Sequence, residues 1–193
     1  THPEEIVVIG GHMDSWDVGQ GAHDDAGGCI SAWRAVSLIK ELGLRPRRTL
    51  RVVLWTNEEN GSRGSRNYRN EHLNELENHI LAIESDGGVF APLGFGFTGN
   101  KEARKVVYDI ADLLDPIGAG KITNLGRAPD IAILNDEGVP VMSLNVENSK
   151  YFWYHHTSAD TFDKVDYNEF NDCIAAMAIM AYVVADMEQR LPR

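Results

Sequence analysis

The sequence is short of cysteine, of long apolar runs and of positive charge. Its two cysteines, Cys29 and Cys173, each lie among apolar residues in a helical pattern. This favours buried free thiols over a cysteine-based zinc site, with a single disulfide as the alternative. No apolar run reaches the roughly 20 residues of a membrane helix, and no signal-peptide pattern is present. The formal net charge of -11 argues against a nucleic-acid or anionic-membrane partner.

The composition is that of a globular protein. Hydrophobic residues make up 43% and charged residues 24% of the 193 positions, which is ordinary for a globular protein. A chain of this length forms about one domain with a substantial core. The chain starts at Thr1 and enters an apolar strand pattern almost at once. We therefore expect it to be an interior piece of a longer protein.

Apolar β-branched runs alternate with segments of helical periodicity. We expect strands at 6–9, 49–56, 79–83, 94–98 (at a sheet edge), 122–125 and 139–144. We expect helices at 25–42, 100–116, 129–136 and 166–189, with 61–78 helical in part. This alternation predicts an α/β fold of three layers (αβα), with a mainly parallel twisted sheet and helices on both faces. No repeat or linker divides residues 1–193, so we expect one domain.

Residues that commonly bind metals follow several of these strands. The candidate ligands are His12, Asp24, Glu59, Asp86 and His156. The carboxyl ends of parallel strands share one edge of a sheet, so residues that follow them can meet there. Imidazoles mixed with carboxylates suit zinc, and five ligands are one too many for a tetrahedral ion. Two ions that share one carboxylate would use all five.

Glu58 and Glu59 are adjacent, so their side chains point in different directions. One can be a ligand and the other a general base, and the residue pattern leaves open which. Each candidate also has a simpler interpretation. In these interpretations, His12 is a hydrogen-bonded histidine and the pair Glu58-Glu59 is solvated. Asp24-Asp25 then caps a helix, and His155-His156 belongs to an aromatic loop. Taken singly, these interpretations leave the recurrence of such residues after successive strands unexplained.

Four motifs resemble those of the two-zinc exopeptidase family that includes bacterial aminopeptidases and glutamate carboxypeptidases. In chain order they are GGHMDSWDVGQGAHDDAGG, LWTNEENG, ESDGG and HHTSADT. The resemblance covers nearly the whole chain. It implies the phosphorylase/hydrolase-like fold of zinc peptidases, two zinc ions, a small peptide substrate, a homodimer, and a secreted, lysosomal or periplasmic location. It also implies that residues 1–193 are the C-terminal part of a catalytic domain, without its earlier elements and a protease-associated insert.

The resemblance also implies a role for each candidate. Five residues would be zinc ligands: Asp24 as the bridge, His12 and Asp86 on one ion, and Glu59 and His156 on the other. Three more would act beside them: Glu58 as general base, Asp14 as the residue that orients His12, and Asp130 as a contact for a substrate terminus. His23 stands where close relatives carry an apolar residue, so this additional imidazole beside Asp24 either perturbs the site or faces solvent.

These roles predict a metal-dependent exopeptidase that hydrolyses dipeptides or short peptides with a hydroxide bridging two zinc ions. Two alternatives share the fold. One is a non-catalytic, receptor-like or metal-binding domain, and the other is a single-zinc transferase like glutaminyl cyclase. The number of bound ions separates the three functions. The sequence does not distinguish aminopeptidase from carboxypeptidase activity.

Overall fold

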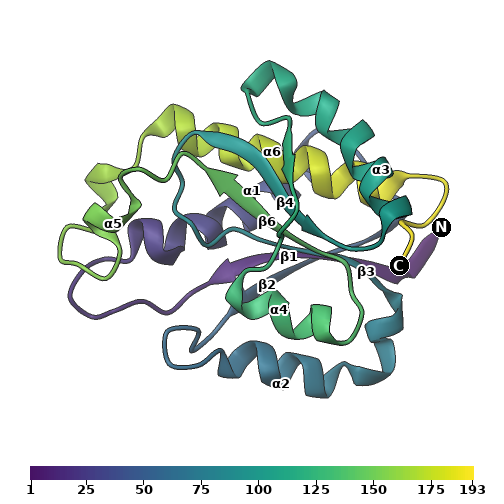
Figure 1. Ribbon diagram of the computed structural model, residues 1–193, viewed down its shortest axis with the longest axis horizontal. Helices are drawn as coiled ribbons and strands as arrows, with labels where there is room; N and C mark the ends of the chain where they lie inside the picture. Colours follow the sequence, from purple (N-terminus) through teal and green to yellow (C-terminus); the bar gives the residue numbers. More distant parts are fainter.

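A computed structural model describes residues 1–193 as three layers, with a six-stranded sheet between two sets of helices (Figure 1). The strands are β1 (His2–His12), β2 (Arg48–Trp55), β3 (His79–Glu84), β4 (Pro92–Thr98), β5 (Lys121–Thr123) and β6 (Val141–Val146). Their order across the sheet is β2-β1-β3-β6-β4-β5. Every neighbouring pair is parallel except β4 and β6, which are antiparallel. The predicted three-layer, mainly parallel fold is confirmed.

Helices cover both faces of the sheet. In Figure 1, α1 (Gly27–Glu41), α3 (Lys101–Ala111) and α6 (Tyr167–Asp186) lie above the sheet, whereas α2 (Arg63–Glu71) and α4 (Pro129–Asp136) lie below it. The short α5 (Tyr151–Tyr154) lies beyond one end of the strands. Short 3₁₀ helices are formed by Leu73–Asn78, Asp112–Ile117 and Phe162–Lys164, and an irregular turn, Ala22–Ala26, precedes α1. No helix combines the length and apolarity needed to cross a bilayer.

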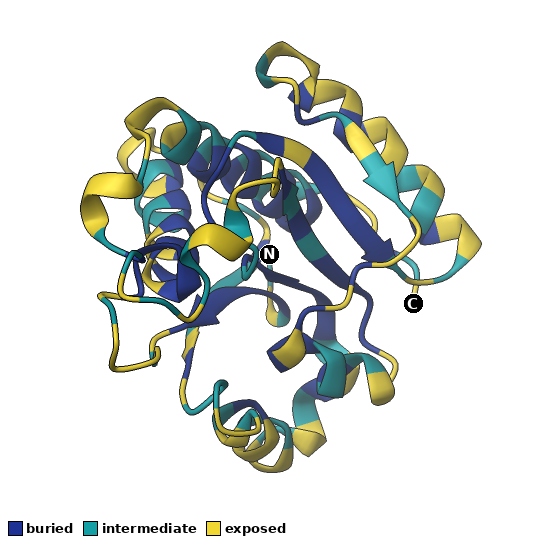
Figure 2. Ribbon diagram, turned by 60° about the vertical axis from the view of Figure 1, so that its left-hand side comes forward, coloured by how far each residue is buried: buried dark blue, intermediate teal, exposed yellow.

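The apolar run of β1 explains why helices are needed on both faces. Alternate side chains of a strand point to opposite faces. Val7 and Ile9 belong to the apolar cluster between the sheet and helices α1 and α6, whereas Ile6 and Val8 belong to the cluster between the sheet and α4. All four are buried, and the central strands are buried along most of their length (Figure 2). A strand with two buried faces is typical of a parallel sheet covered on both sides.

The chain changes direction across the sheet at β1. From β1 it passes through α1 to β2, and then returns through α2 to β3 on the other side of β1. The two connections run over opposite faces, so they diverge at the carboxyl end of β1. Such a switch point is where open α/β sheets form a binding crevice. His12, the last residue of β1, lies there.

The expected edge strand at 94–98 is wrong in its position. β4 is an interior strand, because β5 pairs with its outer side. The close approach depends on glycine, since a Cβ at Gly94 would lie 1.9 Å from the Lys121 carbonyl oxygen. The strand expected at 122–125 is the three-residue β5. The last helix ends at Asp186 rather than near 189.

Several local predictions are confirmed. Cys29 and Cys173 are buried and unpaired. The Asn100 side chain caps α3 by accepting a hydrogen bond from the Ala103 amide at 2.8 Å. Asp166 caps α6 in the same way.

Candidate metal centre

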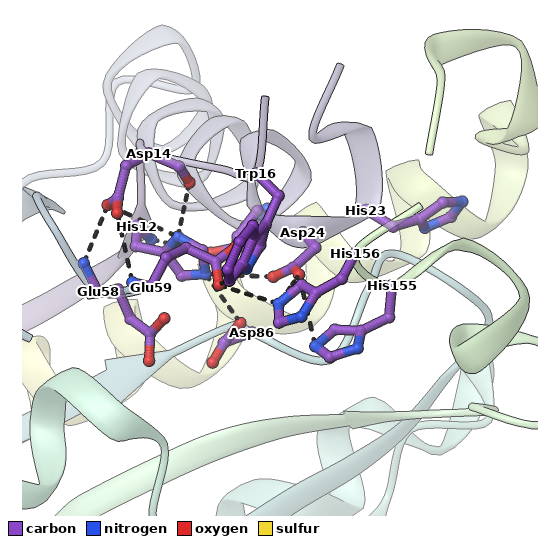
Figure 3. Close-up of polar contacts among 12 residues, drawn as sticks. His12, Asp14, Trp16, His23, Asp24, Glu58, Glu59, Asp86, His155 and His156 are labelled. Carbon is purple, nitrogen blue, oxygen red and sulfur yellow. Dashed lines mark hydrogen bonds and ion pairs between the residues drawn. The ribbon is translucent and has the colours of Figure 1, made fainter. Parts of the chain in front are cut away.

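The structure brings all five candidate ligands together at the carboxyl edge of the sheet (Figure 3). Each comes from a segment that ends or follows a different element: His12 from β1, Asp24 from the turn before α1, Glu59 from beyond β2, Asp86 from beyond β3 and His156 from beyond α5. Local sequence sets each segment, and the shared edge of the strands sets their meeting point. The predicted convergence is therefore a consequence of the fold.

The imidazole of His12 lies between two carboxylates. Its Nε2 is 3.3 Å from Oδ1 of Asp24 and 3.2 Å from Oδ1 of Asp86. The His12 side chain is only 1% exposed. Burial lowers the pKa of His12, but hydrogen bonds to Asp24 and Asp86 outweigh it and raise the pKa above the ordinary value. The negative surroundings that favour a protonated imidazole also favour a bound cation.

A second imidazole lies on the other side of Asp24. Nε2 of His156 is 3.2 Å from Oδ2 of Asp24 and 2.9 Å from Oε2 of Glu59. His156 has a positive φ of 59°, an uncommon conformation for a residue other than glycine. Asp24 thus directs one oxygen to each imidazole.

Two buried oxygen atoms in this cluster have no hydrogen-bond partner. They are Oδ2 of Asp24, whose 3.2 Å contact with His156 is not a hydrogen bond, and Oε1 of Glu59. A buried anionic oxygen without a partner is costly, and a metal cation removes that cost. Together with the mixed imidazole and carboxylate donors, this shows that the cluster suits a divalent metal.

Two further residues lie close enough to be alternative ligands. Nε2 of His155 is 3.6 Å from Oδ2 of Asp24, and the ring stacks on His156. Asp25 groups with His12 and Asp86. However, its oxygens already accept hydrogen bonds from the amides of His12 at 2.9 Å and Gly28 at 3.0 Å. Asp25 therefore joins the first turn of α1 to β1, although the N-cap position itself is Ala26 rather than either aspartate.

Asp14 contacts His12, but through its backbone. Its carbonyl oxygen lies 2.8 Å from Nδ1 of the ring, whereas its carboxylate is 3.9 Å away. The carboxylate instead accepts hydrogen bonds from the amides of Glu58 at 3.1 Å and Glu59 at 3.3 Å. One residue therefore orients an imidazole and also holds the segment that carries both glutamates.

Glu58 lies on the wall of a pocket of about 300 Å³. The pocket is also lined by Asp24, Glu59, Asp86, Pro129, Tyr151, His155 and His156. Partial burial and the charge of Asp86 raise the pKa of Glu58 to about 7. A carboxyl group that titrates near neutrality can both accept and donate a proton.

Asp130 does not line this pocket. It is fully buried in the first turn of α4, and neither carboxylate oxygen has a hydrogen-bond partner. Burial raises its pKa to about 6. A second pocket of about 310 Å³ shares Asp86 and Pro129 with the first and is lined by polar residues that include Arg127 and Asn145.

His23 faces neither solvent nor the ligand cluster. Its ring stacks on Phe90, with centroids 4.3 Å apart, and on Tyr154. The Val89 amide donates a hydrogen bond to Nδ1, and Nε2 lies 3.3 Å from the Lys164 carbonyl oxygen. Burial lowers the pKa of His23. The additional imidazole therefore packs the turn before α1 against two other loops.

Two residues at the site were not predicted as site residues. Trp16 donates a hydrogen bond to Glu59, and Asp160 accepts hydrogen bonds from the backbone of the turn before α1. Both lie inside the quoted motifs, so their position in the sequence was the available signal. A tryptophan or an aspartate in a loop does not by itself indicate which group it contacts, so the sequence alone did not assign a role to either residue.

Imidazoles and carboxylates gathered at the switch point of a doubly wound sheet define a class of protein: α/β proteins with a metal-ligand cluster at the carboxyl edge. The model of Peptidase family M28 matches residues 1–181. The chain therefore belongs to peptidase family M28, which confirms the resemblance shown by its motifs.

Individual relatives agree with this family. The chain is 48% identical to carboxypeptidase Q of Xenopus laevis and 46% identical to that of Homo sapiens, in each case over 192 residues. Each alignment covers 100% of this chain but 41% of the relative, so the chain spans less than half the length of these proteins.

Solved structures share the fold. The crystal structure of a Peptidase M28 precursor from Shewanella amazonensis SB2B has a TM-score of 0.95 and 38% identity, and covers 100% of this chain and 44% of that one. The zinc aminopeptidase BSAP from Bacillus subtilis has a TM-score of 0.78 and 18% identity, covering 97% and 48%. The latter supports the fold alone.

Proposed function

We propose that this chain carries the catalytic centre of a zinc-dependent exopeptidase that hydrolyses dipeptides or short peptides. One observation carries the proposal: the two oxygens of Asp24 face two separate imidazoles, His12 at 3.3 Å and His156 at 3.2 Å. Each imidazole also has its own second carboxylate, Asp86 or Glu59. This is the arrangement expected of two cation sites that share one bridging ligand.

In this proposal, His12 and Asp86 would hold one zinc ion, Glu59 and His156 the other, and Asp24 both. When bound, the ions would polarise a peptide carbonyl and lower the pKa of water. The donor set is of the zinc type, and the Bacillus subtilis neighbour is described as a zinc aminopeptidase.

The chain's own residues supply the proton transfers. Glu58 takes a proton from a water molecule in the pocket and delivers it to the leaving amine, a role that its pKa of about 7 suits. The Asp14 carboxylate accepts a hydrogen bond from the Glu58 amide at 3.1 Å, which fixes the backbone that carries the base. The adjacent pocket of about 310 Å³ has room for a substrate side chain.

The identity of the relatives supports the wider proposal. Carboxypeptidases act on peptides, so we propose a small peptide substrate and neither a nucleic-acid nor a membrane partner. A homodimer and a secreted, lysosomal or periplasmic location remain part of the proposal, as does the assignment of residues 1–193 to the C-terminal portion of a longer catalytic domain. Asp130 is fully buried and does not line the pocket, so the contact with a substrate terminus that the resemblance implies is not part of this proposal.

Zinc analysis combined with dipeptide turnover tests the proposal. We expect two ions per chain in the purified protein. Glu58→Ala should retain both ions and lose about 10²- to 10⁴-fold in turnover, which is the usual contribution of a general base. Glu188→Ala, at an exposed position near the C-terminus, is the matched control.

Other outcomes favour the alternatives. One ion per chain would favour the single-zinc transferase, and no bound ion would favour the receptor-like binding domain. If Glu58→Ala hydrolysed dipeptides as fast as the wild type, the assignment of the base would be wrong.

A further inference from the structure

A buried carboxylate holds the backbone of the bridging residue. Asp160 is 3% exposed. Its Oδ1 accepts a hydrogen bond from the His23 amide at 2.7 Å, and its Oδ2 accepts one from the Asp24 amide at 3.1 Å. Two consecutive amides therefore bind the two oxygens of one side chain. Hydrogen bonds to a charged acceptor are about twice as strong as neutral ones, so this contact strongly restricts the Asp24 backbone.

The same loop carries His156. The turn between them is tight, because the Asp160 amide donates to the Thr157 carbonyl at 3.2 Å and the Ala159 amide donates to the Thr157 hydroxyl at 3.1 Å. The Thr157 amide in turn donates to the Tyr154 carbonyl. A displacement of Asp160 therefore displaces the segment that presents His156.

Gln20 joins the two loops a second time. Its amide donates to the Asp160 carbonyl at 2.9 Å, and its side-chain oxygen accepts from the Phe162 amide at 2.9 Å. The loop with Asp24 and the loop with His156 are thus fixed to each other by both backbone and side-chain contacts, although Asp24 and Asp160 lie 136 positions apart in the sequence.

We propose that Asp160 is a positioning residue that sets the separation between Asp24 and His156, and so assembles the cation site formed by Asp24, Glu59 and His156. The inference rests on the proposed function insofar as these residues bind zinc. His12 and Asp86 extend from β1 and β3, so only one of the three ligands of their ion, the shared Asp24, depends on Asp160. For the other ion, two of the three ligands, Asp24 and His156, depend on it. The two ions should therefore differ in their sensitivity to Asp160.

Asp160→Asn tests this directly. The amide group keeps the shape of the side chain but offers a single acceptor oxygen, and its NH₂ would face a backbone N–H. We expect one zinc ion to bind 10- to 100-fold more weakly, as is usual when a residue that supports a metal ligand is changed. The other ion, which shares only Asp24 with it, should weaken by a smaller factor. Binding is measured by calorimetric titration of metal-free protein.

Two further variants separate positioning from general stability. Asp163→Asn, in the same loop, changes an exposed carboxylate that bonds the Thr161 hydroxyl and contacts Lys164, and should leave both affinities unchanged. Gln20→Ala removes the acceptor for the Phe162 amide at an exposed position. It should weaken the same ion as Asp160→Asn, about two- to fivefold, and it tests the proposal if Asp160→Asn does not fold.

The outcomes distinguish this inference from the proposed function. Wild-type protein that binds fewer than two ions overturns both. Wild-type protein that binds two ions, with equal weakening of both or of neither in the Asp160→Asn and Gln20→Ala variants, overturns the positioning role alone. Urea unfolding of the metal-free proteins shows whether a loss of stability accompanies the change.

Discussion

The indole of Trp16 donates a hydrogen bond from Nε1 to Oε2 of Glu59 at 2.7 Å. The same oxygen lies 2.9 Å from Nε2 of His156, and the Trp16 and His156 ring centroids are 5.2 Å apart. A half-exposed side chain thus fixes the orientation of a nearly buried carboxylate. Because the other oxygen of Glu59 has no partner, the indole determines which oxygen is left unpaired.

Trp16→Phe should weaken zinc binding about 10- to 100-fold, because it removes the hydrogen bond that orients a ligand. Trp33→Phe is the matched control, since Trp33 is exposed on α1. Competition against a zinc chelator measures both affinities. Equal affinities in the two variants would show that the indole does not support Glu59.

Zinc should stabilise the folded protein, because the ligand cluster exists only in the native state. At a free concentration of 100 times the dissociation constant, each ion adds about 2.7 kcal/mol to the free energy of unfolding. Urea unfolding with and without a chelator measures the difference. His12→Asn should reduce the zinc-dependent part, whereas His2→Asn, outside the cluster, should not. An identical zinc effect in His12→Asn would contradict the ligand assignment.

Gly28→Ala should destabilise the protein strongly. A Cβ at Gly28 would lie 2.1 Å from the Ser85 carbonyl oxygen and 2.4 Å from Oδ1 of Asp25, so the backbone of α1 would have to move away from the sheet. Overpacking of this kind costs about 1–3 kcal/mol or more. Gly87→Ala is the control, because nothing lies within 4 Å of its Cβ position. Its effect on urea unfolding should stay within about 0.5 kcal/mol.

His79 should make the metal-free protein less stable in acid. It is fully buried, with Nε2 2.8 Å from the Tyr68 hydroxyl and Nδ1 3.0 Å from the Glu75 carbonyl oxygen. Burial lowers its pKa below the ordinary 6.5. The unfolded chain therefore binds the proton first, and stability falls as the pH decreases below about 6.5.

Urea unfolding between about pH 5 and pH 8 measures this dependence. His79→Gln should reduce the slope by up to about 1.4 kcal/mol per pH unit, the effect of one proton. His2→Gln, near the start of β1, should leave the slope unchanged. A slope that is the same in His79→Gln and in the wild type would contradict the effect of burial.

The sequence predicted the layers, and the meeting of the candidate ligands at one edge, because both depend on local patterns. An apolar run such as 6–9 specifies a buried strand, and a polar residue after it must lie at the edge of the sheet. His12, Glu59 and Asp86 follow this rule. The resemblance of the motifs then supplied the proposed division of these residues between two ions, which the pattern alone left open.

Other features depend on contacts between distant segments. β4 is interior only because the three residues of β5 pair with it, and so short a strand has a weak pattern. The partners of Asp160 lie more than 130 positions away. Asp14 was expected beside the His12 ring, but its carbonyl rather than its carboxylate makes the close contact. Rotamers and register decide such details, and sequence spacing does not specify them.

The antiparallel pair of β4 and β6 restricts which loops of this molecule can grow. Because β4 runs against β6, its first residue, Pro92, pairs with Val146, at the edge where β3 ends. Residues 85–91 therefore join β3 to β4 along one edge of the sheet. A parallel arrangement of the two strands would instead need a crossover connection between opposite edges. An insertion in residues 85–91 would change the segment that carries Asp86. Additional residues are tolerated better at the opposite edge, in the turn between α1 and β2, where the Cβ position of Gly43 has open space around it.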